Sequence, residues 1–238
     1  MSATPLAVDR VTVRYGGVVA LDAVSLSVAP GSVVGLIGPN GAGKTTLINA
    51  ITGVVRPASG TISLGPLRID RLAPHLVARN GVARTYQNIR LFGALTVADN
   101  VRAGAYRRPG TLGDDAVRAL LSRALASDHA LRTRAGTLPY GEQRRLEIAR
   151  ALAADPTVLL LDEPAAGMNP RETSELRSLI RGIAASGTSV MLVEHDMSLV
   201  SAVCDRVTVL NFGEVIAEGT PAQVARDPAV IEAYLGTH

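Results

Sequence analysis

Apolar and polar residues alternate in the first part of the chain as they do in half-buried strands. Residues 11–15 read VTVRY and residues 24–28 read VSLSV, so that every second side chain is apolar. Residues 33–37, VVGLI, are instead an unbroken apolar run, which suits a strand covered on both faces. A turn at Pro30-Gly31 precedes this run, and another short strand is expected at 61–64. We therefore predict a small antiparallel β-subdomain beside a buried strand.

The middle of the chain, from about residue 96 to residue 152, has a helical period instead. Apolar residues recur there at i, i+3, i+4 and i+8, namely Val117, Leu120, Leu121 and Leu125. A second helix is predicted from about Glu142 through Leu152. This region is expected to form a helical subdomain at about 88–152.

Beyond residue 152, short apolar runs alternate with helical patterns. The predicted elements are a strand at 158–162, a helix at 171–185, a strand at 189–193, a helix at 197–203 and a strand at 207–210, in addition to a helix from about Gly43 that stops at Gly53. Two helix starts combine a cap, a proline and a capping-box side chain, at Asn169-Pro170 with Glu172 and at Thr220-Pro221 with Gln223. Strand–helix alternation indicates a mostly parallel sheet, and the 238 residues are expected to form one α/β domain.

The composition restricts the partners and the compartment. Apolar residues make up 47% and aromatic residues 3%, and the net charge is only +3, with arginines scattered among acids. This pattern is typical of a solvated surface, so no nucleic-acid partner is expected. The one cysteine, Cys204, excludes an internal disulfide, fits a reducing compartment and is expected to be a small buried side chain. Because MSATPLAVDR has no leader pattern and the apolar runs are strand-sized, we expect a soluble protein that meets a membrane only through a partner.

A glycine-rich stretch follows the apolar strand and precedes a helix. It consists of Gly38, Pro39, Asn40, Gly41, Ala42, Gly43, Lys44, Thr45 and Thr46, and it fits the phosphate-binding pattern G-x-x-x-x-G-K-[ST]. Glycines let consecutive backbone N–H groups turn inward around phosphate oxygens, and the helix N-terminus adds its dipole. Lys44, the only lysine in the chain, offers a compact charge on a flexible stem, where the broad fork of an arginine would not fit. The hydroxyl of Thr45 is placed to bind Mg²⁺.

Two acids follow a later apolar strand in the sequence VLLLDE at 158–163. We expect Asp162 to hold Mg²⁺ through water and Glu163 to lie where a water is in line with the γ-phosphate. The alternative, a strand followed by a polar turn, loses weight because a phosphate-binding loop precedes it. The guanine-reading motif N-K-x-D needs a second lysine, which the chain lacks, so the nucleotide is expected to be ATP.

These motifs together resemble an ABC-type ATPase over almost the whole chain. The resemblance rests on the phosphate-binding loop, on LPYGEQRRLEIARAL at 138–152, on LLLDEPAAGMNP at 159–170 and on Glu194-His195 after an apolar strand. Within that family, ARTYQNIRLFGALTVADNV at 83–101 and the ending VIEAYLG are similar to the ATP-binding subunits of branched-chain amino-acid importers. The resemblance implies the ABC ATPase fold, a P-loop NTPase core with an N-terminal antiparallel β-subdomain and an inserted helical subdomain, and it implies hydrolysis of Mg²⁺-bound ATP.

The resemblance also implies roles for single residues. Tyr15 would stack on adenine, Gln87 would touch Mg²⁺ and the attacking water, and His195 would contact the γ-phosphate. The alternative for Tyr15 is an ordinary half-buried strand tyrosine. Asn169 falls where the family commonly has an aspartate facing the opposite subunit, and a helix N-cap explains it equally well. The histidines that match no motif are interpreted as surface residues: His75, His129 and His238.

The signature segment departs from the LSGGQ that is typical of the family. It reads Leu138, Pro139, Tyr140, Gly141 and Glu142. The resemblance implies that these residues serve a nucleotide held by the phosphate loop of a second ATP-binding subunit, paired head to tail. Gly141 and the helix behind it can still face a phosphate. Pro139 lacks the hydroxyl and the backbone N–H of a serine, so we expect a weaker contact.

The sequence is therefore interpreted as the ATP-hydrolysing subunit of an ABC importer for branched-chain or related amino acids. Implied partners are membrane permease subunits, a second ATP-binding subunit of the same or a different kind and, indirectly, a solute-binding protein, with the chain at the cytoplasmic face of the membrane. The alternatives are import of amides or urea, a non-transport ABC ATPase, and a module that binds ATP without turnover. In the loop from Gln87 to Leu95, the apolar side chains of Ile89, Leu91 and Phe92 either receive a permease helix or pack inward.

Overall fold

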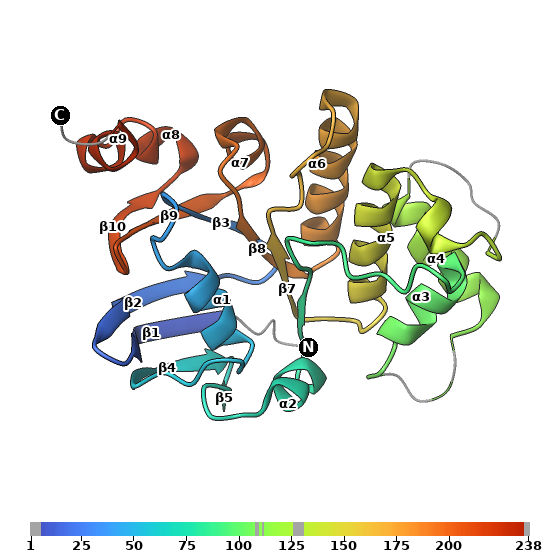
Figure 1. Ribbon diagram of the computed structural model, residues 1–238, viewed down its shortest axis with the longest axis horizontal. Helices are drawn as coiled ribbons and strands as arrows, with labels where there is room; N and C mark the ends of the chain where they lie inside the picture. Colours follow the sequence, from blue (N-terminus) through green and yellow to red (C-terminus); the bar gives the residue numbers. More distant parts are fainter. Residues whose placement is uncertain (1–5, 108–109, 111, 126–130, 236–238) are drawn as a thin grey trace.

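A computed structural model describes residues 6–107, 110, 112–125 and 131–235, which form two sheets with helices around them (Figure 1). The first sheet is antiparallel, with the strand order β2-β1-β4-β5. Its strands are β1 (Leu6–Tyr15), β2 (Val18–Val28), β4 (Ser59–Leu64) and β5 (Leu67–Arg68). The predicted alternation is confirmed at Val11, Val13 and Arg14, but it fails at Tyr15, which is exposed at the end of the strand. Thr12 also departs from the alternation, because its buried hydroxyl accepts a hydrogen bond from Ala23 beside shifts in register.

The second sheet has six strands in the order β10-β9-β3-β8-β7-β6. Its strands are β3 (Val33–Ile37), β6 (Val82–Arg84), β7 (Val158–Asp162), β8 (Ser189–Val193), β9 (Arg206–Asn211) and β10 (Glu214–Gly219). Neighbours from β9 to β6 are parallel, as predicted, whereas β10 returns antiparallel to β9. The pattern did not predict β6 and β10, because β6 has only three residues and β10 is mostly half-buried.

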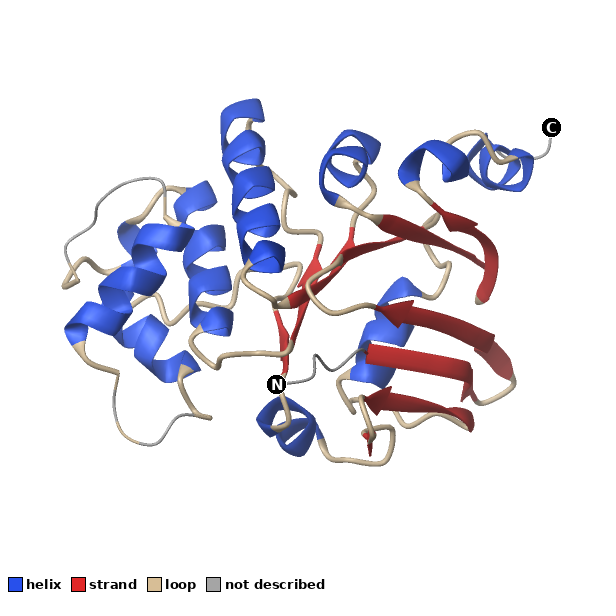
Figure 2. Cartoon of the chain, turned by 180° about the vertical axis from the view of Figure 1, so that it is seen from behind, coloured by secondary structure: helices blue, strands red, loops and turns tan. Residues whose placement is uncertain are grey.

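The central strand β3 is covered on both faces, as its apolar run predicted. Val34 and Leu36 pack with the antiparallel sheet, whereas Val33 and Ile37 pack with helices on the opposite face. The helix α1 (Lys44–Ile51) contributes its buried apolar side chains to the first of these clusters and therefore lies between the two sheets (Figures 1 and 2). Because both elements are packed in this way, the start of α1 is held near the end of β3, with the glycine-rich loop between them.

Further helices cover the outer face and the ends of the six-stranded sheet. They are α2 (Pro74–Arg79), α6 (Pro170–Ala185), α7 (Met197–Val203), α8 (Pro221–Val224) and α9 (Pro228–Leu235). Both predicted capping boxes are confirmed, with Asn169 capping α6 and Thr220 capping α8. Because α8 has only four residues, its cap mainly shapes a turn.

Three helices project beyond β6 and β7 at the right of Figure 1, namely α3 (Val97–Gly104), α4 (Asp114–Ala124) and α5 (Tyr140–Leu152). Val117 and Leu121 on α4 are buried, as predicted, while Leu120 is only partly buried and Leu125 is buried just past the helix end. The helix α5 begins at Tyr140, earlier than the predicted Glu142. Pro139 is its N-cap, where the missing N–H of proline costs no hydrogen bond within the helix.

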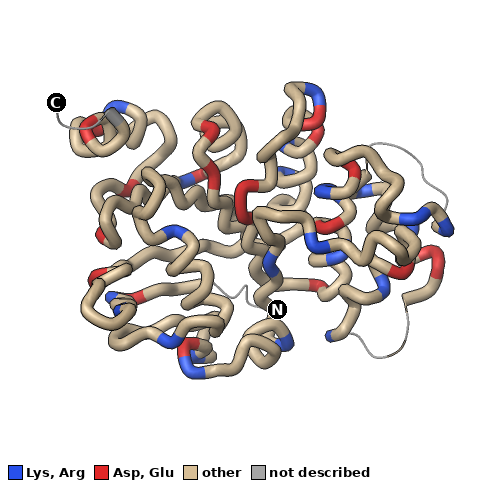
Figure 3. The backbone as a smooth tube through the Cα atoms, in the orientation of Figure 1, with Lys and Arg blue, Asp and Glu red and all other residues tan. Residues whose placement is uncertain are grey.

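Basic and acidic residues are interspersed over the described chain (Figure 3). Cys204 is buried, as predicted, and burial raises the pKa of its thiol to about 12. His75 is exposed, whereas His129 and His238 lie outside the described residues. Within the described ranges, every helix is too short or too polar to cross a lipid bilayer.

Candidate nucleotide-binding site

Four neighbouring parallel strands end at one edge of the six-stranded sheet, and the predicted site residues follow them. The strand β3 leads into the glycine-rich loop, β8 into Glu194 and His195, β7 into Glu163 and β6 into the segment that holds Gln87. Because parallel strands point their carboxyl ends to the same edge, segments far apart in the sequence meet there. The topology thus gathers most of the predicted residues at one place.

The glycine-rich loop packs against its neighbours without room for side chains at two positions. Gly38 and Gly43 have φ values of 150° and 106°. A Cβ at Gly38 would lie 2.1 Å from the carbonyl oxygen of Leu210, and one at Gly43 would lie 2.8 Å from that of Ala20. Gly43 is also the N-cap of α1, whose first turn holds no acidic residue. The positive end of the helix dipole is therefore available to a phosphate.

The ammonium of Lys44 lies across this loop. Its Nζ donates hydrogen bonds to the carbonyl oxygens of Gly38, at 2.7 Å, and Pro39, at 2.9 Å. Burial lowers the pKa of Lys44, and the nearby charges of Glu163 and Asp162 oppose that shift. The ammonium is thus partly desolvated, a condition in which it attracts an entering phosphate more strongly than it would in water.

The carboxylate of Asp162 is held by a buried arginine. Nη2 of Arg84 lies 2.9 Å from Oδ2 of Asp162, and the two side chains are 10% and 9% exposed. Nη1 of the same guanidinium donates to Oδ1 of Asn49 on α1 at 2.7 Å. Arg84 therefore ties the end of β7 to the helix behind the phosphate loop.

Glu163 is held in a sparsely populated backbone conformation, with a φ of 46°. Its N–H donates to the carbonyl oxygen of Val193 at 2.9 Å, which anchors it to β8. Its Oε2 accepts a hydrogen bond from Nε2 of Gln87 at 2.8 Å. Strained residues of this kind gather at functional sites, and here the strain aims a carboxylate and an amide at each other.

Glu194 fastens the loop after Glu163 to the segment that holds His195. Its buried carboxylate accepts hydrogen bonds from the N–H groups of Ala165, His195 and Asp196 at 3.0, 3.1 and 3.4 Å. Burial raises the pKa of this carboxyl, and the three N–H donors oppose the shift. We infer that Glu194 is a structural support, whereas the side chain of His195 is exposed, with its Nδ1 3.9 Å from Oε2 of Glu194.

The phosphate loop, Gln87, Asp162 and Glu163 line one pocket of 530 Å³. The loop from Asn40 to Thr46 forms its floor, Gln87, Asp162 and Glu163 lie at one end, and the apolar lining comes from Val18, Val19, Ala20, Val193 and Phe212. The oxygens of Thr45, Gln87 and Asp162 are hard ligands that suit Mg²⁺, which binds a few protein groups together with phosphates and water. The donor set therefore fits the predicted metal.

Some predicted residues lie outside this pocket. Tyr15, at the end of β1, is 49% exposed and does not line it, and neither does His195. Pro139, Gly141 and Glu142 line a separate hollow of 270 Å³, which they share with Asn169. Within one chain, the signature segment thus does not meet the phosphate loop, so its predicted role requires a second subunit.

The helix that begins with the signature segment holds the backbone beside Gln87. The fully buried guanidinium of Arg144 on α5 donates to the carbonyl oxygens of Tyr86 and Gln87. It also lies 3.1 Å from the carboxylate of Glu147, which in turn accepts a hydrogen bond from the N–H of Arg90. A shift of α5 would therefore pull on the loop that carries Gln87.

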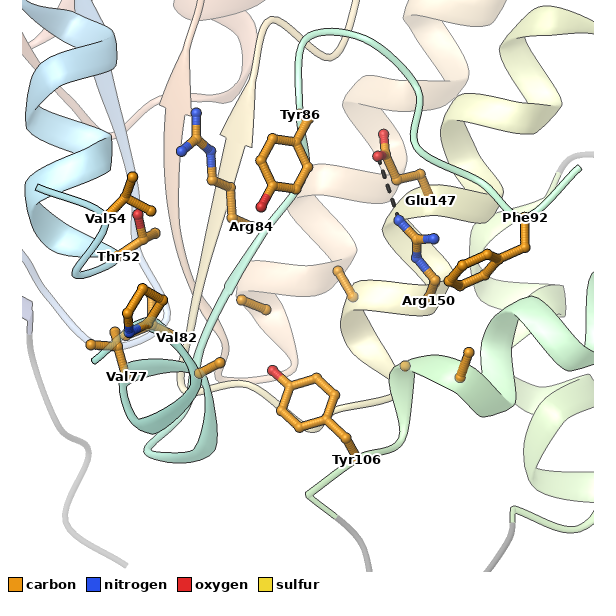
Figure 4. Close-up of a pocket in the computed structure, with 16 residues that line it drawn as sticks. Thr52, Val54, Val77, Val82, Arg84, Tyr86, Phe92, Tyr106, Glu147 and Arg150 are labelled. Atoms are coloured by element: carbon orange, nitrogen blue, oxygen red, sulfur yellow. Dashed lines mark ion pairs between the residues drawn. The ribbon is translucent and has the colours of Figure 1, made fainter. Parts of the chain in front are cut away.

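A second pocket of 330 Å³ lies between α2 and the projecting helices. Figure 4 shows the rings of Tyr86, Phe92 and Tyr106 around it, with Arg84 beside Tyr86. Phe92 is 53% exposed, whereas Leu91 packs against the core. Inward packing of all three side chains is therefore ruled out at Phe92, whereas Leu91 packs inward and Ile89 is half-buried. Binding of a permease helix at this loop stays a prediction.

Sequence reasoning did not single out Arg84 or Phe212, and it did not predict the supporting role of Glu194. It also missed the other apolar lining residues of the pocket, which are Val18, Val19, Ala20 and Val193. Arg84 follows two apolar residues in β6. A cation at such a place needs a buried partner, and this is the one signal in the sequence that could have identified Arg84. Phe212 stands before Gly213 in a tight turn, where asparagine is the usual choice.

Comparisons with known proteins agree with this geometry. The family model described as ABC transporter matches residues 21–166, and one described as Branched-chain amino acid ATP-binding cassette transporter matches residues 214–238. The chain is 42% identical over 254 residues to the high-affinity branched-chain amino acid transport ATP-binding protein LivG of Escherichia coli (strain K12), covering 99% of each protein. It is 41% identical over 214 residues to the lipopolysaccharide export system ATP-binding protein LptB of Acidithiobacillus ferridurans, covering 90% of this chain and 89% of that one.

A solved structure shares the fold. The ADP conformation of an ATP-binding cassette of an ABC transporter matches with a TM-score of 0.88 and 29% sequence identity, over 98% of this chain and 99% of that one. The mixed sheet, the antiparallel sheet and the helices are therefore a known nucleotide-binding arrangement.

Proposed function

Because the chain belongs to the ATP-binding proteins of the ABC transporter family, we propose that it hydrolyses Mg²⁺-bound ATP to power an importer of branched-chain amino acids. One observation carries the proposal. A single pocket places Lys44 and the phosphate loop beside the carboxylates of Asp162 and Glu163. Lys44 and the phosphate loop are needed to bind a polyphosphate, and the two carboxylates are needed to hydrolyse it.

Each residue of the pocket has a task in this reaction. Lys44 and the N–H groups of the loop bind the β- and γ-phosphates. Thr45, Asp162 and Gln87 would hold Mg²⁺, which neutralises phosphate charge when bound. Glu163 accepts the proton of the attacking water, and Gln87 orients that water from its position 2.8 Å from Glu163.

A second ATP-binding subunit completes the site. The segment from Pro139 to Glu142 is remote from the phosphate loop of its own chain, and it starts a helix of thirteen residues. A partner turned head to tail would present this helix start to the γ-phosphate, and ATP would then hold the pair closed. His195 and Tyr15 would close on the nucleotide from the edges of the pocket.

Permease subunits would dock at the 330 Å³ pocket. This contact would hold the chain at the cytoplasmic face of the membrane. Phe92 and Tyr106 supply exposed aromatic surface there. Figure 4 shows Arg150 next to Phe92, and Arg150 is paired with the buried carboxylate of Glu147 at 3.7 Å. A short permease helix with apolar and charged side chains would fit this lining. A movement of this lining would be passed to Gln87, because the carbonyl oxygen of Gln87 accepts a hydrogen bond from Arg144.

The solute class rests on the comparisons and on no residue of the pocket, because an ATP-binding subunit does not touch the solute. The chain is almost as similar to LptB, a protein of a lipopolysaccharide export system, as it is to LivG, so sequence identity alone does not assign the solute. The match at residues 214–238 favours branched-chain amino acids, and a solute-binding protein is then implied. Amides and urea stay the second candidates.

Uptake by the assembled transporter tests the proposal. The chain would be co-purified with its permease, reconstituted in vesicles with ATP inside, and supplied with labelled leucine, valine or urea together with the matching binding protein. We expect ATP-dependent uptake of leucine and valine that Lys44→Ala abolishes. Uptake of urea alone would reassign the solute, and leucine uptake that persists in Lys44→Ala would refute the proposed function.

A further inference from the structure

The turn between β9 and β10 presents an aromatic ring beside the phosphate loop. Asn211 pairs with Glu214, so Phe212 and Gly213 form a two-residue connection. Both have positive φ values, 45° and 84°, as a type I′ turn requires. Asparagine is favoured at the first of these positions, and a bulky side chain there is an outlier. Phe212 is nevertheless 87% exposed, so packing within the chain does not explain its presence.

Hydrogen bonds fix this turn against the nucleotide site. The N–H of Gly213 donates to the carbonyl oxygen of Ala42 at 3.0 Å, which ties the turn to the phosphate loop. The N–H of Asp22 on β2 donates to the carbonyl oxygen of Gly213 at 2.9 Å. The backbone that carries Phe212 is thus held between the phosphate loop and β2.

The order of the strands gives the pocket two chemically different ends. The phosphate loop follows β3, and β7, which leads to Glu163, lies on one side of β3, whereas β9, which leads to Phe212, lies on the other. Phe212 lies on the β9 side of the pocket, and β2, which supplies Val18 and Val19 to the lining, contacts the same turn at Ala20 and Asp22, so this side is apolar. A nucleotide whose γ-phosphate faces Glu163 must therefore extend its base toward this apolar side.

We propose that Phe212 contacts the adenine base and is a determinant of nucleotide affinity, in addition to the predicted contact from Tyr15. This inference rests on the proposed ATP site and adds a base-binding surface to it. An exposed aromatic ring stabilises a base by stacking on its face or by packing against its edge. The strained backbone of Phe212 is then retained because it aims the ring at the pocket.

Two ligands separate the base from the phosphates in a binding test. Isothermal calorimetry with Mg²⁺ would measure the affinity of the full chain for ADP and for inorganic pyrophosphate, which share two phosphates and differ by adenosine. We expect Phe212→Ala to weaken ADP binding about tenfold, the lower range for the loss of one aromatic stack. Pyrophosphate binding should not change, and Phe212→Tyr should keep the affinity of the wild type for ADP.

A second variant distinguishes a binding role from a structural one. Phe212→Asn places the preferred residue in the turn, so we expect a higher melting temperature together with the same loss of ADP affinity. Leu67→Ala, at an exposed apolar position on β5, is the control and should leave ADP binding unchanged.

Three results would overturn the inference. They are unchanged ADP affinity in both Phe212→Ala and Phe212→Asn, a parallel loss of pyrophosphate affinity, and altered dimerisation with unchanged ADP affinity, which would assign the ring to a partner subunit. A wild-type chain that binds neither ligand would instead refute the proposed ATP site, and the inference with it.

Discussion

Replacing Arg84 by methionine tests how the predicted metal-binding carboxylate is held in place. The guanidinium lies 2.9 Å from Asp162, and both side chains are almost fully buried. It also donates to Asn49 on α1. Methionine fills much of the space of the arginine stem and removes its charge, so Arg84→Met leaves Asp162 buried without this cation.

The magnitude follows from the geometry of the pair. At 2.9 Å and an effective dielectric constant of about 20, the Coulomb attraction is about 6 kcal/mol. Desolvation of both charges cancels much of it in the intact protein, but a variant that lacks one partner keeps the cost of the buried charge. We therefore expect Arg84→Met to lower the free energy of unfolding by about 3–5 kcal/mol. Combining it with Asp162→Asn removes both charges and should recover a large part of the loss.

Urea unfolding of the nucleotide-free chain without Mg²⁺, followed by circular dichroism, measures these changes. Arg14→Met, at an exposed position on β1, is the control and should shift the free energy of unfolding by less than about 0.5 kcal/mol. A loss below about 1 kcal/mol for Arg84→Met would refute the reasoning. Strict additivity of the two single substitutions in the double variant would do so as well.

Three further predictions concern other parts of the molecule. Phe92→Glu should leave the melting temperature unchanged and weaken co-purification with the permease. Leu91→Glu should lower the melting temperature, because Leu91 packs against the core. The reverse pattern would contradict the orientations assigned to the two side chains. Since burial raises the pKa of Cys204 to about 12, the unfolded chain loses the thiol proton first, so stability should fall as the pH rises from about 9 to 12, and less so in Cys204→Ala. If the missing hydroxyl at Pro139 weakens the partner's site by about 1–3 kcal/mol, Pro139→Ser in a Glu163→Gln chain should strengthen ATP-dependent dimerisation measured by light scattering. A tight homodimer with Pro139 in place would contradict that hypothesis, which favours a heterodimer with unequal sites.

Periodicity predicted the elements that carry large apolar faces. The strands at 158–162 and 189–193 and the helix at 197–203 have the predicted bounds, because apolar runs define the two strands and Asp196 caps the start of the helix. The short strand β6 has no such pattern, since its three residues are stabilised mainly by pairing with β7. Local sequence does not report a partner strand that follows more than seventy residues later in the chain.

The glycine-rich loop was predictable because its chemistry is local, in nine consecutive residues. Arg84, Glu194 and Phe212 were not, because their importance comes from what lies opposite them. Arg84 meets Asp162, Glu194 meets the backbone of Ala165, and the turn that carries Phe212 meets Ala42, each through space. The roles predicted for Tyr15, His195 and the signature segment likewise depend on a bound nucleotide and a second subunit, so they stay predictions.

The measurement that tests the central claim most directly is single-turnover hydrolysis of ATP by the assembled transporter with Glu163→Gln. Glu163 lies in the pocket beside Lys44, and its carboxylate contacts Gln87. If this carboxylate is the general base, the variant should bind ATP as tightly as the wild type and hydrolyse it about 10²–10⁴-fold more slowly. Hydrolysis at the wild-type rate would show that Glu163 is not the base and would contradict the account of the site.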